Sequence, residues 1–168
     1  MITATVDREG IRGPTGNLPW SDFREDGRVR WPFELPYENF RLLDPLTRFI
    51  AIAVEALDCS FEPNTAILLA SSTGCLATDR LFEQSRHEVL RPALFPYTLP
   101  SSPMAAVAIR HRVTGAGLCL SIAPDDSETP FTEALRILDA GEACAVIVCV
   151  GDVVPGERMT MTATLVQP

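Results

Sequence analysis

The sequence contains no lysine, and all fourteen of its basic residues are arginines. This absence excludes catalysis through a lysine amine or a Schiff base. The sequence has only two histidines, His87 and His111. Metal sites need three or four convergent ligands, and no such spacing is found. The sequence therefore predicts no metal and no other cofactor.

Positive charge and long apolar runs are also scarce. The formal net charge is -8, which argues against nucleic-acid binding because phosphate contacts need clustered arginine or lysine. The longest apolar run, residues 143–150, is far shorter than the roughly 20 residues of a membrane span. The N-terminal residues lack the pattern of a signal peptide, and the five cysteines form no CxxC pair. Reduced, buried thiols and a cytoplasmic location are therefore expected.

The composition is that of a protein with a hydrophobic core, since 46% of the residues are hydrophobic and 21% are charged. A length of 168 residues suits one domain, which we expect to span residues 1–168. Residues 7–38 show no periodicity, and we expect an irregular segment there that lies on a partner surface.

The remaining chain alternates between strand and helix patterns. Strands are expected at residues 2–6, 65–70, 118–122, 143–150 and 159–166, and helices at 43–57, 76–89, 104–113 and 129–140. Asp44 can cap the first helix and Pro45 suits its first turn. Four prolines interrupt residues 91–103. This order predicts an α/β fold with a mixed, mostly parallel five-stranded sheet and helices on both faces.

Three segments, in this order, resemble the β-ketoacyl synthase family. The first is NFRLLDPLTRFIAIAVEAL at residues 39–57, similar to the opening helix of those enzymes. The second joins ILLASSTG at 67–74 to FPYTLPSSPMAAVAIRHRVTG at 95–115, similar to a glycine turn, a Phe-Pro-x-Thr-x-Pro segment and an alanine-rich helix. The third, residues 118–152, is similar to the nucleophile segment and the elements after it. The resemblance implies the N-terminal half of a thiolase-like fold.

The resemblance also locates the nucleophile position. In the family a cysteine lies 17 residues before the glycine of a Gly-Glu turn, and counting back from Gly141 gives Pro124. Proline offers neither a nucleophilic atom nor a backbone N–H for an oxyanion hole. The family's two histidines and lysine belong to a second half that this sequence does not reach. The chain is therefore expected not to be an enzyme.

The two carboxylates after Pro124 allow two interpretations. Asp125 and Asp126 precede the helix expected at residues 129–140, where they suit capping of its N-terminus. The alternative is an acid and base pair in an enzyme of another kind. Two adjacent carboxylates on a turn lack the usual orienting geometry, so capping is favoured.

Other residues are expected to meet a partner. Because the helix at 129–140 is apolar on more than one side, it predicts burial against a second subunit. Arg110 and Arg112, which flank His111, form a candidate basic patch for an acidic acyl carrier protein, with a plain surface cluster as the alternative. His87 is expected on a solvated helix face, and Cys75 as a buried filler. The resemblance implies a partner interface or acyl tunnel at Phe95, Thr98, Ser102, Met104, Cys119 and Phe131.

These observations favour a non-catalytic, chain-length-factor-like partner of a full-length β-ketoacyl synthase. It would act in fatty-acid or polyketide-type biosynthesis and shape the acyl tunnel. The alternative is a homodimeric acyl-binding or scaffold protein that needs no catalytic partner.

Overall fold

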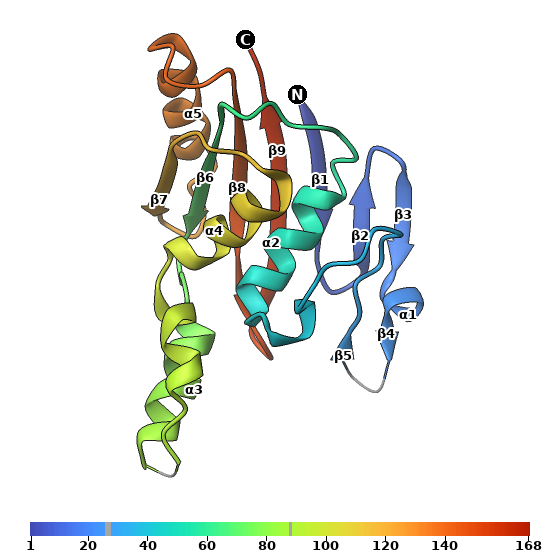
Figure 1. The fold of residues 1–168 in the computed structure, drawn as a ribbon, viewed down its shortest axis with the longest axis vertical. Coiled ribbons are helices and arrows are strands. Elements are labelled where there is room, and N and C mark those ends of the chain that lie inside the picture. The colour runs from blue at the N-terminus through green and yellow to red at the C-terminus, as the bar shows by residue number, and fades with distance from the viewer. Residues whose placement is uncertain (26–27, 88) are drawn as a thin grey trace.

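One large sheet organises the molecule. The computed structural model describes residues 1–25, 28–87 and 89–168. The seven strands of the sheet lie in the order β3-β2-β1-β9-β8-β6-β7 (Figure 1). Their bounds are β1 Ile2–Val6, β2 Gly10–Gly13, β3 Gly16–Pro19, β6 Thr65–Ser71, β7 Gly117–Ser121, β8 Ala145–Val154 and β9 Arg158–Val166. Beyond β3 lie the short helix α1 (Trp20–Phe23) and the strand pair β4 (Arg24–Glu25) and β5 (Arg28–Val29).

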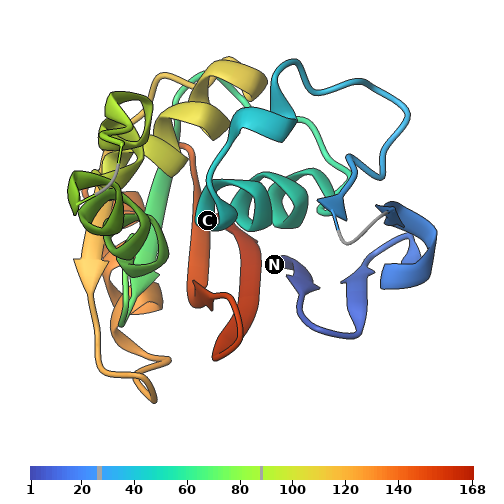
Figure 2. The same cartoon turned by 90° about the horizontal axis from the view of Figure 1, so that it is seen from below.

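Helices cover both faces of the sheet (Figure 2). The helices α2 (Pro45–Glu55) and α4 (Ser101–His111) pack on one face, and α5 (Thr129–Asp139) packs on the other. The 3₁₀ turn η1 (Phe40–Leu42) leads into α2. The helix α3 (Leu76–His87) and the 3₁₀ helix η2 (Pro92–Thr98) lie side by side and project from one end of the molecule (Figure 1). We call α3 and η2 the arm, and the rest of the structure the body.

The predicted α/β class, with helices on both faces, is confirmed. The strand count and the mostly parallel pairing were wrong. Residues 10–19, expected to be irregular, form a hairpin that pairs with β1 and adds two strands. Among the strands that the structure describes, only the pairs β6–β7 and β6–β8 are parallel. The chain turns back after Val154 with too few residues for a crossover, so β8 and β9 pair antiparallel.

The strand β6 is the centre of the core, since all seven of its residues are buried. Successive side chains of a strand point to opposite faces. Ile67 and Leu69 therefore join the cluster beneath α2 and α4, whereas Leu68 joins the cluster beneath α5. This burial on both faces is typical of a parallel strand covered by helices.

The helix α2 begins as its sequence predicts. The Asp44 carboxylate accepts the backbone N–H groups of Leu46 at 3.0 Å and Thr47 at 3.3 Å, and Pro45 occupies the first helical position. Burial raises the pKa of Asp44, although hydrogen bonds from Thr47 oppose the shift. A cap of this kind contributes about 1 kcal/mol to helix stability.

The helix α5 is less exposed than its sequence predicts. Ala134 and Ile137 are buried against β6 and β8, and Phe131 and Leu138 are half-buried on the same cluster. Leu135 is the large apolar residue of α5 that faces solvent, with 52% of its surface exposed. Among the described helices, none is both long and apolar enough to cross a membrane.

Candidate functional site

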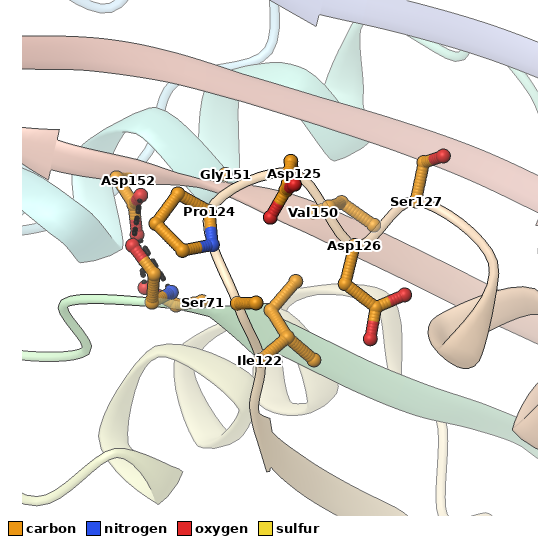
Figure 3. Close-up of a pocket in the computed structure, with 11 residues that line it drawn as sticks. Ser71, Ile122, Pro124, Asp125, Asp126, Ser127, Val150, Gly151 and Asp152 are labelled. Atoms are coloured by element: carbon orange, nitrogen blue, oxygen red, sulfur yellow. Dashed lines mark hydrogen bonds between the residues drawn. The ribbon is translucent and has the colours of Figure 1, made fainter.

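The candidate site lies where the parallel strands β6, β7 and β8 end. The carboxyl ends of parallel strands form the edge at which open α/β sheets bind ligands. A cavity of about 130 Å³ opens there between three segments of the chain (Figure 3). It is lined by Ser71 and Ser72 after β6, residues 122–127 after β7, and Val150, Gly151 and Asp152 of β8.

Pro124 lies exposed in the loop after β7, between the side chain of Asp152 and those of Asp125 and Asp126 (Figure 3). The loop is attached to the sheet by the backbone N–H of Ile122, which donates to the Ser71 carbonyl at 3.2 Å. Proline has no side-chain or backbone donor. The loop therefore offers no nucleophilic atom at Pro124.

The N-terminus of α5 is occupied by a carboxylate of the chain itself. Asp126 Oδ1 accepts the backbone N–H of Glu128 at 3.1 Å and that of Thr129 at 3.0 Å. The hydrogen bonds to Thr129 hold the pKa of Asp126 below its usual value. Asp125 is exposed. The capping interpretation is thus confirmed for Asp126.

Asp152 is the most heavily hydrogen-bonded carboxylate of the site. Its oxygens accept bonds from the Ser71 hydroxyl at 2.7 Å, the Ser72 hydroxyl at 2.6 Å and the Thr73 hydroxyl at 3.0 Å. They also accept the backbone N–H groups of Ser72 at 2.9 Å and Thr73 at 3.0 Å, and Arg158 Nη1 at 3.1 Å. Burial alone would raise the pKa of Asp152, but the bonds from Ser72, Ser71 and Thr73 outweigh it and hold the pKa well below its usual range.

Sequence reasoning missed Asp152, although a Gly-Asp pair near the end of a buried strand was the available signal. Gly151 precedes it with φ 154°, and a Cβ atom there would lie 2.1 Å from the Thr160 carbonyl oxygen of β9. Only glycine fits so close an approach of two backbones. Gly151 therefore lets β9 pair closely beside Asp152.

The six residues expected at a partner interface do not form one cluster. Phe95 and Thr98 lie on the arm, and the Thr98 hydroxyl donates to the Phe95 carbonyl at 2.7 Å. Phe131 belongs to α5 and packs on the opposite face of the sheet from Met104. Ser102, in the first turn of α4, donates to the Pro96 carbonyl and so joins α4 to the arm.

Met104 and Cys119 meet at the β7 edge of the sheet. Cys119 Sγ lies 3.8 Å from Met104 Sδ and donates to the Pro100 carbonyl at 3.1 Å. Although the Cys119 side chain is exposed in part, desolvation of its thiol raises its pKa. Met104 is 8% exposed and belongs to the main core. Its role in the free chain is therefore packing.

Arg110 does not belong to an open basic patch. Its Nε and Nη2 donate to the two carboxylate oxygens of Glu55 at 3.0 and 2.8 Å, and its side chain is 17% exposed. The guanidinium also lies about 5 Å from the ring centroids of Trp31 and Tyr37 and donates to two backbone carbonyls of residues 35–36. Arg110 thereby holds the segment before α2 against the body. Arg112 is exposed.

The remaining histidines and cysteines have structural surroundings. His87 is exposed on the arm, as predicted. His111 stacks edge-on against Phe61 at 5.0 Å, and burial lowers its pKa. Cys75 is buried as predicted, and burial raises its pKa to about 12. Burial was wrongly predicted for Cys119 and for a second thiol, Cys144, because both are exposed. No group of three metal-ligating side chains occurs within the described part of the chain.

Comparison with known proteins identifies the fold. No protein-family model matches the sequence, and no curated protein matches it either. Among solved structures, the complex of the ketosynthase ApeO with its chain length factor ApeC from Xenorhabdus doucetiae is similar, with a TM-score of 0.75 and 16% identity. The match covers 99% of this chain and 77% of that chain.

Two further structures agree. The ishigamide ketosynthase/chain length factor is similar with a TM-score of 0.72 and 13% identity, over 100% of this chain and 61% of that chain. A β-ketoacyl synthase from Burkholderia phymatum STM815 is similar with a TM-score of 0.68 and 11% identity, over 99% of this chain and 58% of that one. This chain thus spans only about three-fifths of the latter two. Likeness at such low identity establishes architecture, and the chain has the thiolase-like fold of the ketosynthases.

Proposed function

We propose that this chain is a non-catalytic, chain-length-factor-like subunit that binds a full-length β-ketoacyl synthase and shapes its acyl tunnel. The pathway would be of the fatty-acid or polyketide type. The observation that carries the proposal is a ketosynthase-like fold in which the loop after β7 has Pro124, a residue without a nucleophilic atom, and in which Asp126 caps the N-terminus of α5. The lack of a nucleophilic atom at Pro124 favours a supporting role over the covalent chemistry of a condensing enzyme.

The apolar surface of the arm supports the proposal of a partner with a large interface. Exposed large apolar side chains gather there and in the residues that flank η2, namely Leu81, Val89, Leu90, Phe95 and Leu99. Phe95 is 56% exposed and touches Phe82 with ring centroids 5.9 Å apart. Apolar groups gathered on a projecting element are typical of protein interfaces. We assign the arm to the surface that lines the partner's tunnel.

The β7 edge supplies a second contact surface. Its five residues alternate between exposed and half-buried, and it pairs with β6 on one side only. An uncovered edge strand presents backbone N–H and carbonyl groups to any strand that approaches. Cys119 lies on this edge, so a ketosynthase strand paired there would bury it.

An acyl carrier protein is a further proposed partner. One similar structure is a type II polyketide synthase carrier protein in complex with its ketosynthase (AntDE:AntF), with a TM-score of 0.62 and 12% identity over 78% of this chain and 50% of that one. Because Arg110 is engaged with Glu55, Arg112 is the residue of the pair that can meet an acidic carrier.

Co-expression with a full-length, cysteine-bearing β-ketoacyl synthase from the same organism tests the proposal. We expect the two chains to purify together in equal amounts. Phe95→Asp should abolish the complex because it places a charge in the apolar interface. Ile109→Asp is the matched control, since Ile109 is 79% exposed on α4, away from the arm. A soluble monomer that binds no such synthase would refute the proposal.

A homodimer is the second candidate function, and the uncovered β7 edge favours it because two copies could pair there. The mass of the protein expressed alone separates the two. A stable dimer that does not exchange with a ketosynthase would indicate an acyl-binding or scaffold protein. A monomer that becomes a heterodimer would indicate the partner subunit.

A further inference from the structure

The arm is joined to the body through a narrow base. The turn at residues 71–74 leads from β6 into α3, and residues 99–101 lead from η2 into α4. In α3 only Thr78 and Ser85 are buried. The body core reaches the arm through Cys75, 4% exposed, immediately before α3. So small an apolar contact cannot by itself fix the direction of the arm.

Polar contacts at the base of the arm fix the turn at residues 71–74 where apolar packing is slight. Asp152 accepts the hydroxyl and backbone N–H of both Ser72 and Thr73. The Ser71 hydroxyl donates to Asp152 and accepts the backbone N–H of Gly74 at 2.8 Å. Every residue of the turn is therefore tied to one carboxylate, directly or through Ser71.

A second carboxylate holds the first turns of α3. The Thr78 hydroxyl, buried with 1% exposure, lies 3.4 Å from Asp44 Oδ2 at the start of α2. On the surface, Arg80 pairs with Glu157 of the β8–β9 turn at 2.6 Å. The ion pair between Arg80 and Glu157 is exposed to solvent and adds little to stability. Asp152, which accepts five donors from the turn at residues 71–74, is the dominant attachment.

We infer that Asp152 is a positioning residue that fixes the direction in which the arm leaves the body and, through it, the place of the arm's apolar side chains in the partner's tunnel. The first part concerns the free chain alone. The second part rests on the proposed function. The two parts are tested separately, so failure of one is distinguishable from failure of the other.

The free chain is tested by the distance between two spin labels carried on unnatural residues at Gln84 of the arm and Gln167 near the C-terminus. We expect one narrow distance distribution in the wild-type chain and a distribution at least twice as wide in Asp152→Asn. An amide cannot accept six donors and brings donors of its own. Ser72→Ala, which removes a single hydroxyl bond, should give an intermediate width even if Asp152→Asn folds poorly.

The control is Thr5→Val. It removes one hydroxyl pair of the same kind, Thr5 with Thr162 at 3.1 Å, from the body sheet. Its distance distribution should match wild type. Folded Asp152→Asn and Ser72→Ala chains with wild-type widths, or an equal widening in Thr5→Val, would overturn the inference.

In the reconstituted complex, the readout is the length distribution of the acyl products. Ser72→Ala and Asp152→Asn should bind the ketosynthase within about threefold of wild type yet spread the products over more lengths. A merely structural role would lower the yield of complex without changing product length. Wild-type product lengths from a variant whose arm distribution has widened would overturn the second part of the inference. Absence of any complex would refute the proposed function but leave the result on the free chain intact.

Discussion

The body and the arm place their apolar side chains in opposite ways. In the body, β6 buries every residue, and the clusters on both faces of the sheet are continuous. In the arm, the buried residues of α3 are the polar Thr78 and Ser85, whereas Leu81 and Phe95 face outward. Burying Leu81 and Phe95 would stabilise the free chain, yet both side chains remain exposed. The difference teaches that the body is stabilised from within, whereas the arm leaves large apolar side chains in solvent, and it is this exposure that supports the proposed partner.

The largest effect is expected in the body. Leu68→Ala removes a side chain with 0% exposure between the sheet and α5, and should lower the free energy of unfolding by about 3 kcal/mol. Urea denaturation measures it. Leu135→Ala, on the exposed side of α5, is the matched control and should change stability by less than about 1 kcal/mol. Equal losses in the two variants would contradict the described burial of Leu68.

The joint between body and arm should respond to acid. The pKa of Asp152 is lower in the folded chain than the value of about 3.9 expected when unfolded. Its contribution is therefore complete above that value and is lost as the pH falls below it. Asp152→Asn should cost about 2 kcal/mol at pH 7, and the gap to wild type should shrink below about pH 4.

Urea denaturation at several pH values measures this gap. Asp125→Asn is the control, because Asp125 is exposed and its substitution should change the free energy of unfolding at pH 7 by less than about 1 kcal/mol. A gap for Asp152→Asn that stays constant down to pH 3 would show that its carboxylate charge is unimportant.

Within the body, the ion pair between Arg110 and Glu55 should stabilise the attachment of the segment before α2. Arg110→Ala leaves the half-buried carboxylate of Glu55 without its bidentate partner and should cost about 1–2 kcal/mol. Arg110→Lys should not restore the loss, since an ammonium cannot make the planar pair of bonds. Arg112→Ala, at an exposed position, should be nearly neutral. Thermal unfolding followed by circular dichroism measures both variants. An equal loss of stability in Arg110→Ala and Arg112→Ala would contradict the structural role given to Arg110.

The smallest effect on stability is expected in the arm. Phe95→Ala should change the free energy of unfolding by less than about 1 kcal/mol, because Phe95 is 56% exposed. The same variant should weaken ketosynthase binding at least about tenfold if Phe95 lies in the interface core. Titration calorimetry gives the affinity, with Ile109→Ala as control. A large loss of stability in Phe95→Ala would show instead that Phe95 stabilises the fold of the free chain.

Local features of the chain were largely predictable. The cap at Asp44, the positions of the main helices and strands, and the capping role of Asp126 all depend on residues within a few positions of one another. Such contacts form wherever the local sequence recurs, so pattern and spacing are enough to locate them. The assignment of Pro124 to the nucleophile position depends on a spacing count and stays a prediction.

Contacts between distant segments were not predictable. The hairpin β2–β3 joins the sheet only because β1 pairs with β9 some 160 residues away in the chain. Asp152 receives donors from a turn about 80 residues earlier, and Glu55 meets Arg110 across 55 residues. No periodicity encodes which distant partner a polar side chain finds.

The sequence by itself determined the approximate positions of the main helices and of five of the strands, the lack of a thiol or hydroxyl at Pro124, and the absence of lysine chemistry. These properties follow from side-chain identity and nearest neighbours along the chain. Only the tertiary structure decided the strand order, the exposure of Leu81 and Phe95 on the arm, and the place of Asp152 at its base. Burial and polar satisfaction depend on which segments meet in space, and that is fixed by the packing of the whole chain.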